Sequence, residues 1–431
     1  MQNQLYYGDN LEVLQKYIQN ESIDLCYVDP PFNSSRNYNQ IYTNTGHDDI
    51  DQANAFVDTW SWGMSAEIQL DELRKNPFYH RELVETVLGF ERILGKGSLL
   101  AYLVNMAVRF AEIWRVLKPT GSFYVHCDPT ASHYLKILLD AIFCTRGGDF
   151  NNEIIWRRHY SHNDGKKFGC IHDVIFYYVK SKEYTYNRQH LPYTKEYIEE
   201  HYDNIDEQTG QRFRSVSMNG AGQGEARYFG DKLLNPPKGR HWIWTQERIN
   251  KAMESGLIYF SSKGVPRYKQ FLDKMEGVPV QDNWTDFYSL SSHAKERLGY
   301  PTQKPLALLE RIIKTSSNKG DVILDAFCGC GTTVDAAQSL NRKWIGIDIT
   351  FNSISLIIKR LQDRYGRKIM KKIVLNGLPE DVESARALAH KEDDRLRKEF
   401  EKWAILTYTD NQAKINDKKG ADKGIDGIAY I

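Results

Sequence analysis

The chain has 431 residues, 41% of them hydrophobic and 26% charged, and its formal net charge at pH 7 is +1. This length suffices for one large domain or two to three modest ones with a buried core. The near balance of charges excludes a global basic field, so any nucleic-acid surface must be local. No apolar run approaches the length of a membrane span, the start MQNQLYYGDN is no secretory signal, and the six cysteines are scattered. We therefore expect a cytoplasmic protein whose cysteines are reduced.

The first predicted element surrounds Tyr6-Tyr7-Gly8-Asp9-Asn10, which leads into apolar residues at helical spacing. The pattern predicts a strand end, a turn and a helix. A plain helix cap is one of two roles open to Asp9, and ligand binding is the other.

The stretch SIDLCYVDPPF contains a short apolar run, Ile23–Val28. Such a run predicts a buried parallel strand, and open α/β sheets bind ligands at the carboxyl ends of their strands. Pro30 and Pro31 hold the backbone extended and remove two N–H donors, which leaves carbonyl acceptors beside the Asp29 carboxylate and the Phe32 ring. These groups could hold a flat ring with an exocyclic amine. A strand followed by a plain Pro-Pro turn is the alternative.

A polar, aromatic stretch from residue 33 to Trp62 is too long for a simple connector, and we interpret it as a functional lid. A helix is then predicted over Leu99–Leu117, a strand over Phe123–Cys127 and a second helix over Ser132–Phe143. Lys118–Gly121 is expected to end the first of these helices. The alternation of strands and helices favours a parallel sheet.

The composition changes after Trp156. Lys and Arg outnumber Asp and Glu by seven to three between Trp156 and His190, and by twelve to five between Gln211 and Lys274. The glycine-rich SMNGAGQGEARYFG is not expected to form a regular core element. Basic side chains contact phosphates while aromatic residues and adaptable loops reach bases, so the region is predicted to bind nucleic acid; an ordinary solvated face is the alternative. The interleaved aromatic residues are Trp242, Trp244, Tyr228, Phe229 and Tyr268.

Three histidines, His159, His162 and His172, match no standard metal-binding spacing. We interpret them as surface residues and predict no metal site.

Pro301–Pro305, PTQKP, precedes an amphipathic helix predicted over Leu306–Thr315. A second apolar strand, Val322–Leu324, then runs into the loop AFCGCG, whose glycines let backbone approach a ligand closely. A third strand ends at Asp348, about where a carboxylate would bind the hydroxyls of a ribose.

The motifs DPPF and DVILDAFCGCGTT together resemble the signatures of amino-methyltransferases that modify DNA at N6 of adenine or N4 of cytosine. The order, with DPPF first, then the basic insert, then the glycine loop, is similar to the circularly permuted, beta-type members, and the resemblance covers roughly Leu5–Leu378. It implies an α/β fold of the Rossmann-like class I methyltransferase type: a mostly parallel twisted sheet with helices on both faces and an inserted DNA-recognition region. The expected domains are residues 1–155 (catalytic half), 156–299 (target-recognition insert), 300–378 (cofactor-binding half) and 379–431 (helical linker and truncated nuclease start).

The resemblance also implies the roles of individual residues. Asp29, Pro30, Pro31 and Phe32 would be catalytic. S-adenosylmethionine would be the cofactor, with Asp9 at its adenine, Thr302 and Lys304 at its methionine moiety, and Asp325 near its ammonium group. Phe327, Gly329, Gly331 and Thr332 would wrap it, and Asp348 would bind its ribose.

The implied reaction is methyl transfer to N6 of a flipped adenine in duplex DNA, as part of a restriction-modification system. Asp29 and the Pro30 carbonyl would accept the two amine hydrogens, which directs the nitrogen lone pair at the methyl group without a metal or a covalent intermediate. Asp before Pro-Pro favours adenine N6, and cytosine N4 stays open. The chain has no Pro-Cys dipeptide, which removes attack at cytosine C5. Methylation of RNA or of protein amides, and a silent DNA-binding module, are further alternatives.

Residues 379–431 are expected to begin with a charged helix up to Leu406. Gly420–Gly427, GADKGIDG, resembles the first acidic motif of restriction-endonuclease-like domains, in which Asp426 would hold a magnesium ion. The Glu-x-Lys partner does not follow. We therefore expect either a fragment of a longer restriction-modification fusion or a charged end, with a separate or fused nuclease as partner and no nuclease activity from these residues alone.

Overall fold

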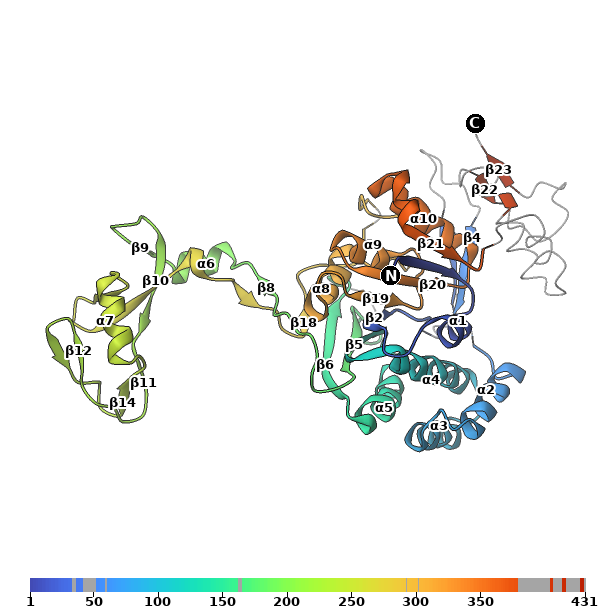
Figure 1. The fold of residues 1–431 in the computed structure, drawn as a ribbon, viewed down its shortest axis with the longest axis horizontal. Helices are drawn as coiled ribbons and strands as arrows, with labels where there is room; N and C mark the ends of the chain where they lie inside the picture. The colour runs from blue at the N-terminus through green and yellow to red at the C-terminus, as the bar shows by residue number, and fades with distance from the viewer. Residues whose placement is uncertain are drawn as a thin grey trace. The chain divides into compact units, whose positions relative to one another are not determined.

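The fold was analysed on a computed structural model of the chain. It describes residues 1–32, 36–41, 52–58, 60–161, 165–291, 293–300, 302–378, 404–405, 413–415 and 427–429. The chain divides into two compact units, one formed by residues 1–187 with 281–431 and the other by Arg188–Val280 (Figure 1). The smaller unit is an insertion in the larger one, and each is described by itself.

The first unit is built on a nine-stranded sheet with the order β18-β6-β7-β5-β2-β19-β20-β1-β21. All neighbouring strands pair in parallel except β7, which is antiparallel to both β5 and β6. The predicted, mostly parallel sheet is thus confirmed. Its strands are β1 (Asn3–Tyr7), β2 (Ile23–Val28), β5 (Leu117–Cys127), β6 (Asp149–Arg157), β7 (His172–Val179), β18 (Asn283–Trp284), β19 (Val322–Asp325), β20 (Lys343–Asp348) and β21 (Ile373–Asn376).

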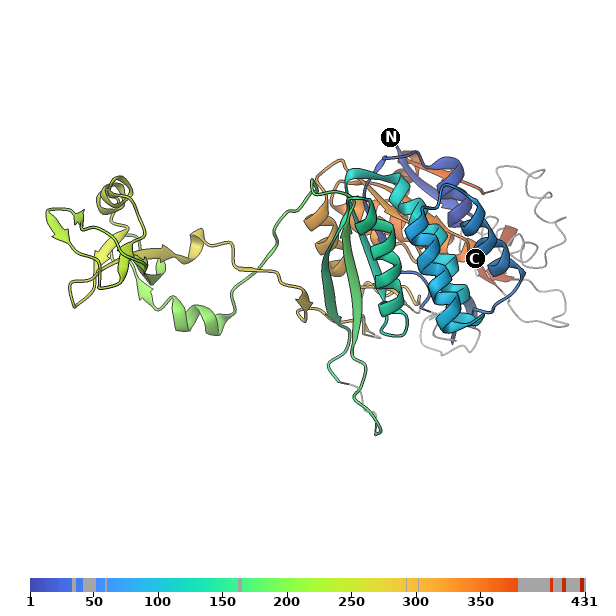
Figure 2. The ribbon, with the colours of Figure 1, turned by 90° about the horizontal axis from the view of Figure 1, so that it is seen from below.

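Helices cover both faces of this sheet (Figures 1 and 2). One layer contains α1 (Asn10–Tyr17), α2 (Met64–Lys75), α3 (Arg81–Leu94), α4 (Ser98–Val116) and α5 (Ser132–Phe143). The other contains α8 (Leu306–Ser316), α9 (Thr332–Ser339) and α10 (Phe351–Tyr365). Because α4 lies between other helices and the sheet, it is apolar on nearly all sides, and Leu103 and Phe110 have no exposed surface. The α/β class and the two helical layers agree with the sequence.

Helix α4 ends at Val116, directly before Lys118–Gly121, as predicted, but the next strand, β5, starts earlier than expected, at Leu117, and includes these residues. The pairing of β2 with β5 shifts register here, between Ile23 and Leu25. Lys118 Nζ lies 2.8 Å from both carboxylate oxygens of Asp24 on β2, which holds the irregular segment against the sheet. A Pro-Thr-Gly sequence therefore marks a bulge in this strand.

The inserted unit, Arg188–Val280, is shorter than the predicted insert of residues 156–299, because β7 and β18 and the end of β6 belong to the large sheet. It holds a four-stranded antiparallel sheet, β15-β16-β10-β9, short strand pairs and two helices. Its elements are β8 (His190–Leu191), α6 (Lys195–His201), β9 (Asn204–Ile205), β10 (Arg212–Ser217), β11 (Asn219–Ala221), β12 (Arg227–Phe229), β13 (Lys232–Leu234), β14 (Arg240–Trp242), α7 (Gln246–Glu254), β15 (Ile258–Phe260), β16 (Pro266–Phe271) and β17 (Val278–Pro279).

Two expectations for this unit are wrong. The glycine-rich stretch does contribute to the core, through Met218 and Phe229 beside strands β11 and β12. Trp242 and Trp244 are also buried in that core and cannot reach a base, whereas Tyr228 is exposed. Short strands give these residues buried positions because pairing, rather than sequence periodicity, sets which face they occupy.

Parts of the predicted lid and tail lie outside the described residues. Of the lid, residues 33–35, 42–51 and 59 are not described, and β3 (Arg36–Ile41) pairs with β4 (Gln52–Asp58) in an antiparallel hairpin. Of the tail, β22 (Ala413–Ile415) and β23 (Gly427–Ala429) pair, while Asp426 and most of the predicted helix lie outside. Within the part of the chain that is described, no helix has the length and apolar character to cross a membrane.

We predict that Phe110→Ala destabilises the first unit by about 3–5 kcal/mol, because it leaves a cavity between α4 and the sheet, where Phe110 has no exposed surface and stacks edge-on against Phe123. Ile93→Ala, at a side chain that is 77% exposed, should change stability by less than about 0.5 kcal/mol. Urea unfolding followed by tryptophan fluorescence measures both. Equal midpoints for the two variants would contradict this view of the core.

Candidate active site

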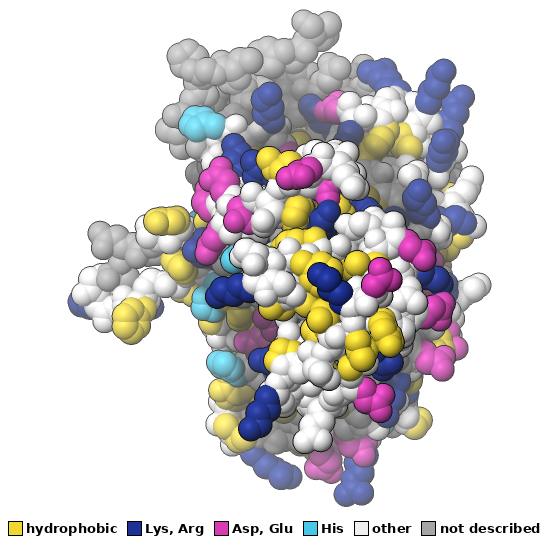
Figure 3. Space-filling view, turned by 90° about the vertical axis from the view of Figure 1, so that its left-hand side faces the viewer, with side chains coloured by type: hydrophobic (Ala, Val, Ile, Leu, Met, Phe, Trp, Pro, Cys, Tyr) yellow, Lys and Arg dark blue, Asp and Glu magenta, His cyan; other side chains and the backbone are white. Residues whose placement is uncertain are grey.

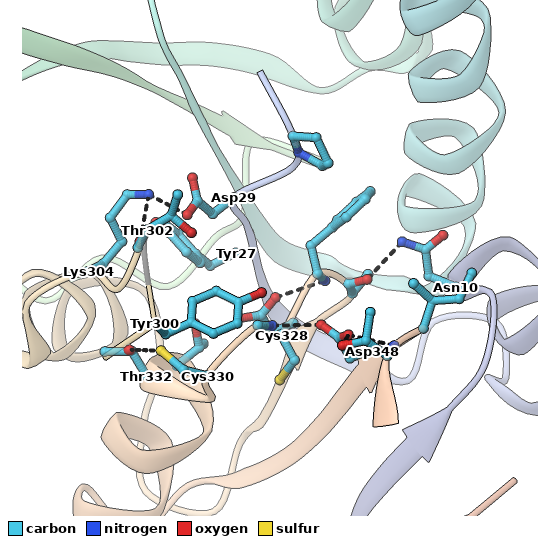
Figure 4. Close-up of a pocket in the computed structure, with 18 of the residues that line it drawn as sticks. Asn10, Tyr27, Asp29, Tyr300, Thr302, Lys304, Cys328, Cys330, Thr332 and Asp348 are labelled. Carbon is cyan, nitrogen blue, oxygen red and sulfur yellow. Dashed lines mark hydrogen bonds and ion pairs between the residues drawn. The ribbon is translucent and has the colours of Figure 1, made fainter. Parts of the chain in front are cut away.

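Three acidic residues stand at the carboxyl ends of three adjacent parallel strands. Asp29 follows β2, Asp325 ends β19 and Asp348 ends β20. All three line a pocket with a volume of about 550 Å³ (Figure 4). Of the predicted site residues, those that line this pocket are Asp9, Asp29, Pro31, Thr302, Lys304, Asp325, Phe327, Gly329, Thr332 and Asp348.

The remaining predicted residues, Pro30, Phe32 and Gly331, are not part of the pocket lining. Pro30 is buried behind the strand end. Gly331 lies on the side of the loop that packs against α10. It has φ +74°, and a Cβ there would lie 2.7 Å from Ile357 Cγ1, so a larger residue would not fit. Gly331 is therefore required by the fold of the loop and does not itself line the cavity.

The glycine loop is held in place by Asp348. One carboxylate oxygen of Asp348 accepts a hydrogen bond of 2.8 Å from the Gly329 backbone N–H, and the other accepts bonds of 2.9 and 3.0 Å from Thr350. Gly329 has φ +49°, which favours glycine, and a Cβ there would lie 3.2 Å from the ring of Tyr300. The loop thus presents backbone to the cavity, as the sequence predicted.

Asp325 is buried at the floor of the pocket, with 4% of its surface exposed. Burial raises the pKa of this carboxyl to about 7, although its hydrogen bond of 3.0 Å from the Phe327 N–H opposes the shift. A buried acid of this kind becomes fully charged near neutral pH when a cation approaches it.

Asp29 forms an ion pair with Lys304 Nζ through its Oδ2 (Figure 4). Both side chains are largely buried, with 17% and 10% of their surfaces exposed. Asp29 Oδ1 is also buried, and it accepts no hydrogen bond from the described residues. Such an acceptor costs free energy unless a ligand donates to it. The lysine that the sequence assigned to the cofactor thus lies against the predicted catalytic acid.

The helix cap at Asp9 involves an arginine that sequence reasoning missed. Asp9 Oδ1 caps α1 through the Leu11 N–H at 2.9 Å, which is the alternative role that the sequence left open for this residue. Asp9 Oδ2 pairs with Arg109 of α4 at 2.8 Å, and Arg109 Nε also donates to Asn10 Oδ1 at 2.6 Å. Arg109 is a charged side chain in a mostly apolar stretch of α4, and that was the available signal for its role.

A buried polar chain behind the DPPF segment was also missed. Tyr27 OH lies 2.9 Å from His126 Nδ1, and His126 Nε2 lies 3.0 Å from Asp173 Oδ2. The His126 ring stacks on Phe32, with ring centroids 6.0 Å apart. Each of the three polar residues is at most 2% exposed, so this chain fixes Phe32 from behind.

Trp60, at the end of the predicted lid, lines the pocket as well. Its indole Nε1–H is buried and donates no hydrogen bond to the described residues. The pocket therefore contains an unpaired acceptor on Asp29 and an unpaired donor on Trp60. Together they match a ligand that carries both an N–H and a ring nitrogen.

Comparison with known proteins yields several relatives. The type II methyltransferase M.EcaI of Enterobacter cloacae is 35% identical over 262 residues, which are 60% of this chain and 57% of that protein. The Mod subunit of the type III restriction-modification enzyme StyLTI of Salmonella typhimurium is 28% identical, over 78% of this chain and 50% of that protein. The DNA adenine methyltransferase YhdJ of Escherichia coli is 25% identical, over 83% and 82%. The chain thus spans about half the length of the first two relatives.

Among solved structures, the complex of M1.HpyAVI with SAM has 17% sequence identity and a TM-score of 0.37, over 83% of this chain and 98% of that chain. At this score the likeness supports no argument about the site. A family model described as DNA methylase, of the N6/N4 methyltransferase type, matches residues 23–359, more than half of the chain. That match runs from the strand that carries Asp29 through the glycine loop and Asp348, and the chain therefore belongs to the N6/N4 DNA methylase family.

Proposed function

We propose that the protein transfers a methyl group from S-adenosylmethionine to the N6 amino group of a flipped adenine in duplex DNA. The observation that carries this proposal is the buried, unpaired Asp29 Oδ1 at the end of the DPPF strand, in the same pocket as the glycine loop. A buried acceptor without a donor of its own suits the amine of a base that enters from outside.

The pocket residues fit S-adenosylmethionine. The volume of the pocket, about 550 Å³, is in the range of small-molecule sites, and Phe327 and Ile349 give the pocket apolar walls. Asp325 offers a buried carboxylate for an ammonium group, and the backbone at Gly329 leaves room for close approach. When bound, S-adenosylmethionine supplies an electrophilic methyl group. Asp9, Thr302, Thr332 and Asp348 remain the proposed contacts for the rest of the molecule.

Asp29 performs two tasks in this proposal. Its Oδ1 accepts one hydrogen of the exocyclic amine, and the Pro30 carbonyl accepts the other, which directs the nitrogen lone pair away from the ring. The amine loses one proton when it gains the methyl group, and the Asp29 carboxylate is the proposed acceptor for it. Lys304 holds the Asp29 carboxylate in position throughout.

Phe32 supplies the stacking surface for the flipped base, since the chain Tyr27–His126–Asp173 fixes its ring from behind. The Trp60 N–H could donate to a ring nitrogen next to the amine. Adenine N1 and cytosine N3 both meet that requirement. The preference for adenine therefore rests on the Asp-Pro-Pro-Phe sequence and on the relative named as an adenine methyltransferase. N4-cytosine methylation is the second candidate.

The inserted unit, Arg188–Val280, is proposed to bind the DNA around the target. Within it, the stretch Gln211–Lys274 has twelve Lys and Arg against five Asp and Glu, which provides phosphate contacts, and Tyr228 is an exposed aromatic residue there. Relatives named as parts of restriction-modification systems support a nuclease partner, separate or fused.

Asp29→Ala should lower the methylation rate by about 100-fold or more, because it removes the carboxylate that accepts one hydrogen of the amine. S-adenosylmethionine affinity should stay within about threefold. Mixed-sequence duplex DNA is methylated and digested, and the methylated nucleosides are quantified by mass spectrometry. Asp71→Ala, on the exposed face of α2, is the control. N4-methylcytosine in the wild-type digest would overturn the choice of base, and activity of Asp29→Ala at the wild-type level would overturn the role of the acid.

Lys304→Met should lower kcat about tenfold or more and leave the Kd of S-adenosylmethionine within about threefold, because Lys304 pairs with Asp29. Single-turnover kinetics and equilibrium titration separate the two quantities. Lys75→Met, at an exposed lysine that pairs with Asp71, is the matched control. A large rise in Kd with an unchanged kcat would instead assign Lys304 to the cofactor.

S-adenosylmethionine affinity should rise with pH between about 5.5 and 7.5, because the Asp325 carboxyl, with its pKa raised to about 7, is largely protonated below that value and cannot attract an ammonium group. Well below pH 7 the change approaches about tenfold per pH unit. Asp325→Asn should bind more weakly and lose this dependence. Calorimetric titration across the range measures it, and identical pH profiles for the two proteins would refute the assignment.

A further inference from the structure

In the connection between β6 and β7, the described residues 158–161 and 165–171 form an arm that projects from the sheet (Figure 2). Its described residues include Phe168, whose surface is 100% exposed, and Tyr160, which is 81% exposed. Two large aromatic rings exposed on one short segment mark it as a candidate contact surface, because burying them against a partner is favourable. The sequence of the arm also contains Arg158, Lys166 and Lys167 against the single acid Asp164.

The arm starts at the edge of the sheet where the pocket lies. β6 and β5 are both antiparallel to β7, so β6 runs in the same direction as β5 and β2. The end of β6, at Arg157, therefore lies on the same edge as Asp29, which follows β2.

Arg158, the first residue of the arm, is connected by a series of contacts to Phe32, the proposed stacking surface for the base. Arg158 Nε lies 3.0 Å from Asp173 Oδ1, and the other oxygen of Asp173 lies 3.0 Å from His126. The His126 ring stacks on Phe32. Three contacts thus link the first residue of the arm to the predicted stacking surface.

Arg157 and Arg158, where the arm begins, are also held by hydrogen bonds from the segment that contains Tyr288 and Ser289. Ser289 donates both its N–H and its hydroxyl to the Arg158 carbonyl, each at 3.0 Å, and the Arg157 guanidinium is hydrogen-bonded to the hydroxyl of Tyr288. The base of the arm is therefore held by hydrogen bonds, while Phe168 and Tyr160 are exposed. Figure 3 shows exposed hydrophobic side chains, in yellow, on a projection from the molecule.

We propose that this arm is a DNA wedge: it inserts Phe168 into the base stack beside the target, with Tyr160 and the cationic residues against the neighbouring bases and phosphates. The inference rests on the proposed function, since it assumes duplex DNA as substrate. An aromatic ring replaces stacking that is lost when a base leaves the duplex, and a wedge beside a target lowers the cost of opening it. The positive charge of the arm matches the phosphates that flank an opened step.

The test uses the full chain and a duplex in which 2-aminopurine replaces the base next to a site that the wild type methylates, or stands at random positions if no site is found. Wild-type protein should raise the 2-aminopurine fluorescence severalfold. Phe168→Ala should abolish most of the rise and lower kcat/KM on intact duplex at least tenfold, while Phe168→Trp keeps both. Ile93→Ala, at another exposed hydrophobic residue, is the matched control.

A mismatch opposite the target base already weakens stacking and pairing there. Phe168→Ala should recover to within threefold of wild type on such a duplex. Equal losses on matched and mismatched DNA, or a Phe168→Ala protein that unstacks DNA as the wild type does, would overturn the wedge. So would loss of self-association or of a protein partner with unchanged effects on DNA, because that would assign the arm to a protein interface.

The wedge and the proposed reaction fail separately. If wild type unstacks the duplex and Phe168→Ala does not, the wedge holds even where no methylated nucleoside forms, and only the proposed reaction is lost. If wild type methylates DNA but causes no fluorescence change, the reaction holds and the wedge is overturned.

Discussion

The parallel alignment of β2, β19 and β20 is the constraint on which the site depends. Their carboxyl ends lie at one edge of the sheet, so Asp29, Asp325 and Asp348 share one pocket although nearly 300 residues separate the first from the second. Three partly buried carboxylates would repel one another and lose hydration. The unfavourable burial of each carboxylate is offset in a different way. Lys304 pairs with Asp29, while backbone and hydroxyl donors bind Asp348. The raised pKa of Asp325 lets that carboxyl stay protonated near neutrality.

The different environments of the three carboxylates correspond to three different roles. Asp348 is saturated with hydrogen bonds and holds the glycine loop, which makes it structural before it binds anything. Asp325 lacks a cationic partner in the described structure, and a ligand cation would charge it fully. Asp29 keeps one oxygen bound to Lys304 and the other unpaired, so the acid is positioned while an acceptor remains available. A site that binds a charged cofactor and a neutral base needs one carboxylate for each of these roles.

Polar contacts outside the pocket also position the residues of the site. Arg109 fixes Asp9 at the start of α1, and the chain Tyr27–His126–Asp173 supports Phe32 and continues to Arg158 at the root of the arm. Contacts between buried polar groups favour one arrangement of the side chains, so these chains act as supports. The elements that would meet DNA, the inserted unit and the arm, both leave the large sheet by loops, where sequence can vary without loss of the core.

The sequence by itself determined the strand Ile23–Val28, the helix Ser132–Phe143, the glycine loop and the α/β class, because local apolar periodicity and the conformational limits of proline and glycine act over a few residues. It also identified ten residues that line the pocket, since they stand at strand ends or in a characteristic loop. Only the tertiary structure decided that Lys304 faces Asp29, that Arg109 and His126 belong to the site, and that Trp242 and Trp244 are core residues. Those contacts join residues far apart in the chain or depend on strand pairing, and no local pattern encodes which distant partner a side chain meets.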